Sequence, residues 1–186
     1  MLATALLVML VLVAAVTDAT QRTIYNWTTY PGILVGLGLA MAGTLWSWAA
    51  PASADKWQPL LGWLPLGDAL AGLLICGGLM VLCYVFFPVG GGDVKLLTMI
   101  GALGGLEMGL KVLLWTLIFG GCVGLTVLIW RIGAVTLVKR TGQLVVGVLT
   151  LGTVLSPPPE EQQQLKSPIF LGPCAAAALV IAPWFR

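Results

Sequence analysis

Carboxylates hold most of the chemistry that this chain could perform, because the sequence contains no histidine. A chain without histidine cannot form an HExxH zinc site or a Ser-His dyad. Its seven acids are Asp18, Asp55, Asp68, Asp93, Glu107, Glu160 and Glu161. Asp18 ends the first hydrophobic run, and Asp93 follows three glycines at the start of a later one. An acid at bilayer depth costs about 2.5–3.5 kcal/mol on insertion scales, so acids at such boundaries are candidates for function.

Asp18 and Asp93 together suit the hydrolysis of a peptide bond, provided that the fold brings them close. Like charges a few ångströms apart cannot both ionise cheaply, so a pair of carboxylates holds one proton. The ionised acid can then activate water while the protonated acid polarises a carbonyl. Gly90 and Gly92 lack Cβ atoms and would let an extended substrate approach the backbone. The structural alternative is that Asp93 only caps a helix N-terminus, where negative charge is favourable.

Long hydrophobic runs must position these acids. Of the 186 residues, 59% are hydrophobic and only 9% are charged, against roughly 25% charged in soluble domains. Runs of about 20 apolar residues match the bilayer core. The predicted spans cover residues 1–17, 30–50, 66–87, 112–130 and 169–185, with a short sixth helix over residues 94–106. The sequence thus predicts an all-α polytopic integral membrane protein with about six transmembrane helices, in one membrane-embedded domain over residues 1–186.

The positive charges predict how these helices are oriented, because Lys and Arg concentrate in short cytoplasmic loops. With the N-terminus outside, six cations face the cytoplasm and three do not. The six are Arg22, Lys95, Arg131, Lys139, Arg140 and Lys166, and the three are Lys56, Lys111 and Arg186. This orientation places Asp18 and Asp93 at the cytoplasmic face and Asp68 and Glu107 at the opposite face.

Polar segments account for the remaining acids. Residues 131–167 include three consecutive prolines and the Glu160-Glu161 pair, and they are predicted to form a cytoplasmic loop. Within it, the apolar residues 144–155 could be interfacial or buried. Asp55 is also expected in a solvated loop.

The cysteines and the net charge exclude several other classes of function. Cys76, Cys83, Cys122 and Cys174 fall inside predicted spans and form no CxxC pair, so they are expected to pack as small apolar side chains. No metal or other cofactor is therefore predicted. The net charge of +2 is too small to indicate a nucleic-acid partner, and the expected surroundings of the helices are lipid.

Two blocks of the sequence resemble the type IV prepilin peptidase family. The stretch GGGDVKLLTMIGALGG, from Gly90, resembles the GxGD block of that family, and DATQRTIYN, from Asp18, resembles its first aspartate block. The C-terminal SPIFLGP, from Ser167, resembles the start of the family's last span. The two aspartate blocks occur in the family's order and at the expected helix boundaries. The resemblance therefore covers nearly the whole chain.

The resemblance implies a GxGD membrane aspartic protease in which Asp18 and Asp93 are the catalytic acids. It makes Gly90 and Gly92 the glycines of the motif, with Lys95 and Asn26 as supporting residues. The expected substrates are prepilins or pseudopilins with a basic leader followed by a hydrophobic helix. They would be cut at the cytoplasmic face of the bacterial inner membrane.

The chain departs from the family pattern in three respects. Tyr25 stands where the family usually has proline, and the basic stretch is reduced to Arg22. These changes bear on substrate preference more than on activity. The chain also lacks the CxxC insertion of the longer members, so it resembles the short branch that processes tight-adherence (Flp) prepilins, and methyltransferase activity is not expected.

Other functions fit the sequence less well. The main alternative is a non-catalytic membrane scaffold or assembly subunit of a pilus or secretion system, which would tolerate the loss of either aspartate. A transporter should show inverted repeats or broken helices in both halves, and the sequence shows neither, although the break at Gly90 is a partial match. Presenilin-like proteases share the GxGD motif, but the sequence around Asp18 argues against that group.

Overall fold

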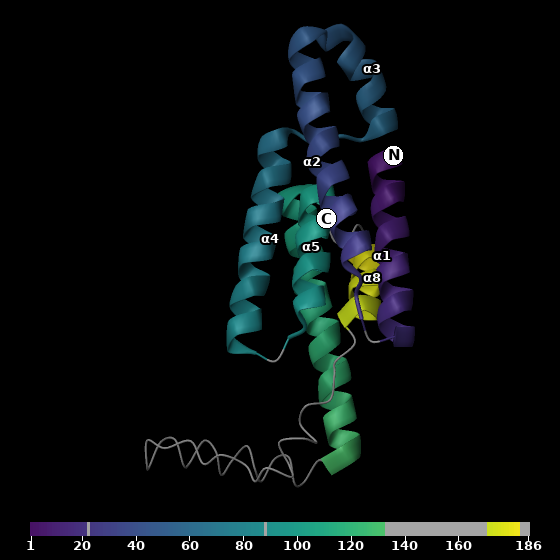
Figure 1. The fold of residues 1–186 in the computed structure, drawn as a ribbon, viewed down its shortest axis with the longest axis vertical. Coiled ribbons are helices and arrows are strands. Elements are labelled where there is room, and N and C mark those ends of the chain that lie inside the picture. The colour runs from purple at the N-terminus through teal and green to yellow at the C-terminus, as the bar shows by residue number, and fades with distance from the viewer. Residues whose placement is uncertain (22, 88, 133–170, 183–186) are drawn as a thin grey trace. The chain divides into compact units, whose positions relative to one another are not determined.

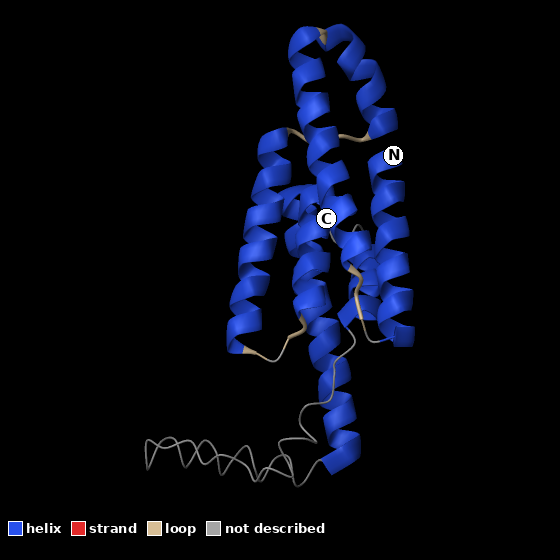
Figure 2. Cartoon of the chain, viewed as in Figure 1, coloured by secondary structure: helices blue, strands red, loops and turns tan. Residues whose placement is uncertain are grey.

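The described part of the chain is entirely helical. The computed structural model describes residues 1–21, 23–87, 89–132 and 171–182, which form helices joined by short loops, with no strand among them (Figure 1) (Figure 2). The helices are α1 (Leu2–Gln21), α2 (Asn26–Ala49), α3 (Pro51–Leu61), α4 (Leu66–Phe86), α5 (Gly91–Ile132) and α8 (Leu171–Ile181). The predicted all-α fold is confirmed.

Two compact units divide the chain. The first comprises Met1–Phe119 together with Phe170–Arg186, and the second comprises Gly120–Ile169. Asp18, Asp68 and Asp93 all belong to the first unit. The predicted loop over residues 131–167 belongs to the second, and all of it beyond residue 132 lies outside the described residues, including the apolar segment 144–155 and the Glu160-Glu161 pair.

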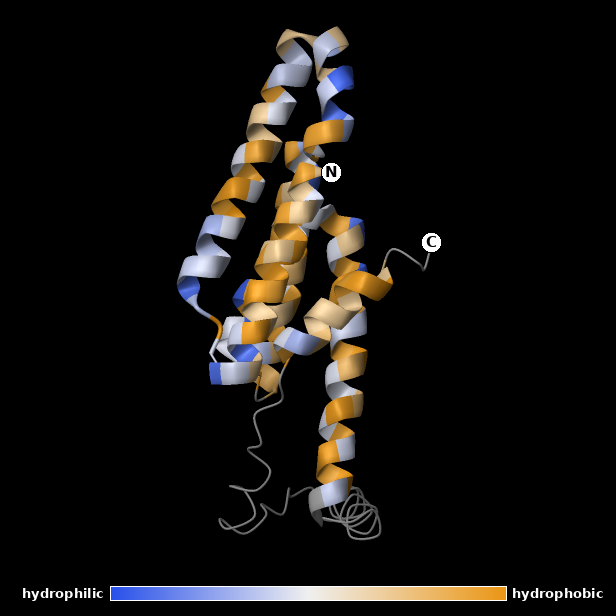
Figure 3. Cartoon of the chain, turned by 90° about the vertical axis from the view of Figure 1, so that its right-hand side faces the viewer, coloured by the Kyte–Doolittle hydropathy of each residue, from blue (hydrophilic) through white to orange (hydrophobic). Residues whose placement is uncertain are grey.

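Four helical stretches are long and apolar enough to cross a bilayer. They are Leu2–Gln21, Asn26–Ala49, Pro51–Phe86 and Gly91–Trp130. Much of the length of these helices is hydrophobic (Figure 3). Large apolar side chains also lie on outward faces, since Val85 and Phe86 of α4 are 70% and 73% exposed. Lipid would cover such surfaces, so the chain is a membrane protein. The predicted number of about six spans is not confirmed, because α8 has only 11 described residues and the fourth stretch contains a sharp turn.

The sharp turn lies at Gly105 and divides α5 into two antiparallel parts. Gly105 has φ 79° and ψ −179°, a backbone conformation that other residues rarely adopt. In a continuous helix, Gly101 and Gly109 would be about 12 Å apart along the axis. Here a Cβ on Gly109 would lie 2.9 Å from Cα of Gly101, so the chain has turned back. The predicted helices over 94–106 and 112–130 correspond to these two parts, which are joined by one glycine rather than by a loop.

Helix α3 was not predicted, and the assignment of Asp55 to a loop was wrong. Pro51 begins this helix and Gly62 ends it in the left-handed conformation, with φ 70°. Proline in the first turn and glycine just past the end are typical helix boundaries. The N-terminal amino group of Met1 donates a hydrogen bond of 3.2 Å to the carbonyl oxygen of Pro59, which ties α1 to α3. Asp55 itself is exposed, as expected.

The core forms around the first part of α5. Leu96, Leu97, Met99 and Ile100 are at most 1% exposed and join one apolar cluster with residues of α1, α4 and α8. Glycines bring the neighbouring helices close to this part. A Cβ on Gly36 of α2 would touch Leu103 at 3.0 Å. In lipid, where apolar burial gives little driving force between helices, such close backbone approach is a main source of packing energy.

The closest approach joins α4 to α5. A Cβ on Gly72 would collide with the carbonyl oxygen of Gly101, and a Cβ on Gly101 would collide with the carbonyl oxygen of Gly72. Both contacts are with backbone atoms, which have no rotamer by which to move away. The two helices can therefore pack at this distance only because both positions are glycine.

We expect Gly72→Ala to destabilise the protein by about 1–3 kcal/mol, because the added methyl group forces two backbones apart. Gly78→Ala in the same helix is the matched control, since nothing lies within 4 Å of a Cβ placed there. The control should be unchanged or up to about 1 kcal/mol more stable, because alanine is the better helix former. Thermal unfolding in detergent micelles measures both. A Gly72→Ala protein that unfolds no earlier than the control would contradict this packing.

Candidate active site

Asp18 lies in the last turn of α1 and points into the protein. It is 9% exposed and follows Leu7, Val11 and Ala14 on the buried face of that helix. This spacing of three or four residues puts all four side chains on one face. The backbone N–H of Gly172, in the first turn of α8, donates a hydrogen bond of 2.9 Å to Asp18 Oδ2. The carboxylate is therefore buried and held by a helix N-terminus, where negative charge is favourable.

Asp93 lies in the first turn of α5 and is 7% exposed. Its backbone N–H donates a hydrogen bond of 3.1 Å to the carbonyl oxygen of Gly90. Because it lies in the first turn, its negative charge is also stabilised by the dipole of its own helix. This agrees with the alternative interpretation that Asp93 caps a helix N-terminus. That benefit does not account for its burial, since an acid that served only the dipole could remain in water.

Gly90 and Gly92 are required by contacts within the protein itself. A Cβ on Gly90 would lie 2.9 Å from Asp93 Oδ2, so a side chain there would push the carboxylate away. A Cβ on Gly92 would lie 2.9 Å from Cβ of Ile24, in the connection between α1 and α2. The first glycine gives the acid its space, and the second lets the α1–α2 connection pack against the start of α5.

The fold brings the two predicted acids together from helices that are far apart in the sequence. Asp93 is close enough to Asp18 to experience its negative charge, and the thiol of Cys174 experiences the charges of both. Helix α8, which contains Cys174, packs along α1 (Figure 1). The ends of α1 and α8 and the start of α5 thus meet at one site.

Neither aspartate has a cationic partner within the part of the chain that the structure describes. The ion pair found there joins Lys111 Nζ to Glu107 Oε1 at 2.7 Å, within the second part of α5. Two buried carboxylates without a cation are costly if both are ionised. A pair with one proton avoids that cost, and this is the form that acid/base chemistry on a peptide bond needs.

Lys95 and Asn26 also come together, but they contact each other rather than the acids. Lys95 Nζ donates a hydrogen bond of 2.7 Å to Asn26 Oδ1 and lies 5.1 Å from the ring centroid of Tyr30. Asn26 and Tyr30 both belong to the first turns of α2. Lys95 therefore links the start of α5 to the start of α2, which supports the site by holding the helices that surround it.

Sequence reasoning missed the contribution of α8. Gly172 and Cys174 were not among the predicted site residues, although the C-terminal segment that contains them had been singled out for its resemblance. The pattern Leu171-Gly172-Pro173 marks the start of a helix, and such a start can bind an anion. Only the packing of α8 on α1 shows which anion it meets.

Two other acids in the described part of the chain lie away from this site. Asp68 Oδ1 accepts a hydrogen bond of 3.2 Å from the backbone N–H of Leu106, at the Gly105 turn. Asp55 lies on α3. No group of three or more potential metal-ligating His, Cys, Asp or Glu side chains occurs among the residues described here.

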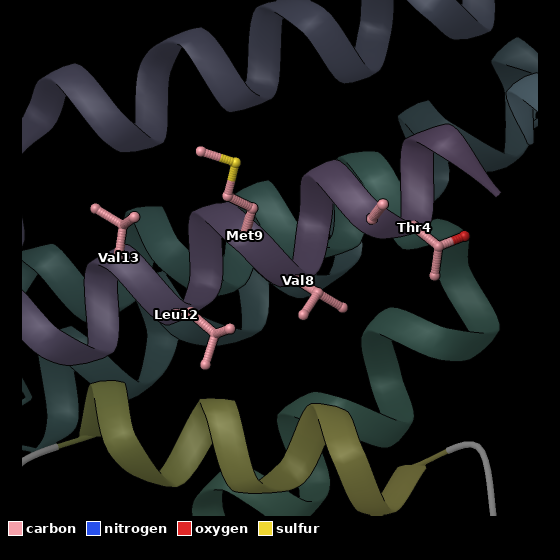
Figure 4. A pocket seen from close by; sticks show the side chains of 6 residues that line it. Thr4, Val8, Met9, Leu12 and Val13 are labelled. Carbon is pink, nitrogen blue, oxygen red and sulfur yellow. The ribbon is translucent and has the colours of Figure 1, made fainter.

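A separate apolar pocket of about 490 Å³ lies along α1. Its lining residues are Thr4, Ala5, Val8, Met9, Leu12 and Val13. Val8 and Leu12 point from α1 toward α8 (Figure 4). The pocket contains no acid, and in a bilayer its open apolar surface would face lipid. It is not the site formed by the aspartates.

Comparison with known proteins identifies the family. A sequence model of the type IV leader peptidase family matches residues 5–125, which include both Asp18 and Asp93 and more than half of the chain. Neither the curated proteins nor the solved structures give a significant match. The family match agrees with the resemblance noted in the two aspartate blocks. The chain belongs to the type IV leader peptidase family.

Proposed function

We propose that this protein is a membrane aspartic endopeptidase that removes the leader peptide of type IV or Flp-type prepilins or pseudopilins. The observation that carries the proposal is the meeting of two buried aspartates, Asp18 and Asp93, without a described cationic partner. Membership of a leader peptidase family supports the reaction class. The aspartic mechanism rests on the chemistry of the pair.

In this mechanism one aspartate is ionised and the other is protonated. The ionised acid takes a proton from water as the water attacks the scissile carbonyl carbon, and the protonated acid polarises the carbonyl oxygen. The tetrahedral intermediate then breaks its C–N bond while an acid donates a proton to the leaving amine. The hydrogen bond from Gly172 orients Asp18 throughout. The proposal does not extend to methylation, because the chain has no CxxC pair.

The proposed substrate has a basic leader followed by a hydrophobic helix. The hydrophobic helix would lie in the bilayer beside the protein, with the scissile bond at the membrane surface. Asp18 is in the last turn of its span and Asp93 in the first turn of another, so the site is at one end of the spans. A basic leader would approach two acids there, which is electrostatically favourable.

Asp18→Asn and Asp93→Asn should each lower leader cleavage by at least about a hundredfold, because an amide cannot exchange the proton that acid/base catalysis requires. The measurement is the size of a co-expressed prepilin on a gel, at matched enzyme levels. Asp55→Asn, which changes an exposed acid on α3, is the control and should cut as the wild type does. Cleavage that survives in both aspartate variants would overturn the aspartic mechanism. A folded wild type that leaves several prepilins uncut would instead favour a scaffold.

Gly172→Ala should lower the turnover number by about ten- to a hundredfold, since catalysis is sensitive to misplacement by about 1 Å. A Cβ at this position would lie 2.7 Å from Asp18 Oδ2 and 2.8 Å from Asp18 Cβ, so the carboxylate must move. Gly38→Ala, where nothing lies within 4 Å of the added Cβ, is the matched control. Steady-state cleavage of a fluorogenic leader peptide measures both variants. Equal turnover in the two would show that the Gly172 contact is not needed.

The site is proposed to face the cytoplasm of a bacterial inner membrane, because Lys95 comes two positions after Asp93 in the sequence and Arg22 comes four positions after Asp18. Trp27, at the start of α2, should then be cytoplasmic, and Trp57, on α3, should be external. Both side chains are exposed. In a background with the native cysteines replaced by alanine, a membrane-impermeant maleimide should label Trp57→Cys in spheroplasts and Trp27→Cys only in inverted vesicles. The reverse pattern would contradict the orientation.

A further inference from the structure

Asp68 is one of the acids that the proposed mechanism does not use, and it lies at the other end of the bundle from Asp18 and Asp93. It belongs to the first turn of α4, and its Oδ1 accepts a hydrogen bond of 3.2 Å from the backbone N–H of Leu106. The two residues are 38 positions apart in the sequence. Asp93 and Gly105 are 12 positions apart, so the Gly105 turn is about 18 Å along the helix axis from Asp93.

Leu106 begins the second part of α5, where the backbone N–H needs a hydrogen-bond acceptor from another helix. The first N–H groups of a helix have no partner within the helix, and the residue before the first turn usually supplies a side-chain oxygen. Here that residue is Gly105, whose φ of 79° favours glycine and excludes most other residues. Glycine has no side chain with which to cap. The turn therefore needs an acceptor from elsewhere, and Asp68 provides it.

The Asp68 carboxylate packs closely against the Gly105 turn and also lies at the start of α4. A Cβ on Gly105 would collide with Asp68 Oδ2, so the carboxylate occupies the space that the missing side chain leaves. The same carboxylate lies at the N-terminus of α4, which means that two helix dipoles favour its charge. An acid that was merely solvated would show neither the bond to a distant backbone nor this steric fit.

We propose that Asp68 is a positioning residue that caps the second part of α5 and so fixes the 91–104 segment that carries Asp93. The capped turn joins that segment to the rest of α5 and holds it against α4, where Gly72 and Gly101 touch. Without the cap, the N–H of Leu106 would lose its acceptor and the turn could open. The segment would then shift along α4 and displace Asp93 at its other end. The catalytic part of this inference rests on the proposed function, whereas the structural part does not.

A disulfide cross-link between α4 and the 91–104 segment measures the structural part directly. A Cβ on Gly77 would lie 3.6 Å from Cβ of Thr98, within the range of about 3.5–4.5 Å that disulfides require. The pair Gly77→Cys and Thr98→Cys, in a background with the four native cysteines replaced by alanine, should therefore cross-link readily under mild oxidation. The rate of cross-linking reports the register of the two helices without any need for catalysis.

Three variants in this background separate capping from a general effect of the mutation. Asp68→Ala removes the acceptor and should slow cross-linking at least about fivefold. Leu106→Pro removes the donor at a helix position where proline is well tolerated, and its ring also displaces the carboxylate that accepted the bond, so it should slow cross-linking at least as much. Asp68→Asn keeps an acceptor oxygen and should retain more than half of the rate. Asp55→Ala, on α3, is the control for loss of an acid. Because the first two variants break the same bond, combining them should add little.

The catalytic part is tested by measuring prepilin cleavage by variants that carry the same Asp68 and Leu106 substitutions in the otherwise native chain. Asp68→Ala should lower the turnover number by about tenfold or more with KM little changed, and Asp68→Asn should restore most of it. Wild-type cross-linking in both Asp68→Ala and Leu106→Pro would overturn the proposal, and so would a loss in Asp68→Asn as large as that in Asp68→Ala. If the wild type cleaves no prepilin, the proposed function fails, yet the cross-linking rates still decide the role of Asp68.

Discussion

The architecture depends on the close approach of α4 to the first part of α5. This approach is possible because Gly72 and Gly101 have no side chains, so each backbone touches the other. Surrounded by lipid, helices gain little from burying apolar side chains against one another, since lipid is equally apolar. Packing energy must come from contact between well-fitted surfaces. The glycines allow that contact and place the 91–104 segment in the middle of the first unit, where α1, α2, α4 and α8 surround it.

The candidate site follows from that placement. Asp93 begins the central segment and Asp18 ends the helix beside it, so both acids are at the same end of the bundle. Burial makes each carboxylate costly, and no described cation offsets the cost. The protein instead offers backbone N–H groups, namely that of Gly172 to Asp18 and the helix start around Asp93. Such groups stabilise a carboxylate without neutralising it, as the proposed mechanism requires of this pair.

At both ends of the 91–104 segment, carboxylates lie at helix N-termini, but their roles differ. At one end, acids lie at the helix starts of α5 and α8, where the proposed chemistry takes place. At the other, Asp68 lies at the helix starts of α4 and of the second part of α5, and its bond to Leu106 closes a turn that glycine alone can make. Glycine at Gly105 provides the backbone conformation, and an acid from another helix provides the cap that glycine lacks.

The sequence by itself determined the class of fold and the two aspartate blocks. Long apolar runs are readable because the bilayer sets their length, and acids at their ends stand out because charge is costly there. Tertiary structure decided what contacts those acids. The helix over 51–61 was hidden by its polar residues. Two separate helices were predicted over 94–106 and 112–130, but only the structure shows that the chain reverses at Gly105 itself. The contribution of Gly172 to Asp18 joins residues 154 positions apart. Helix periodicity and composition describe only neighbours along the chain, so a contact of that kind appears only when the helices pack.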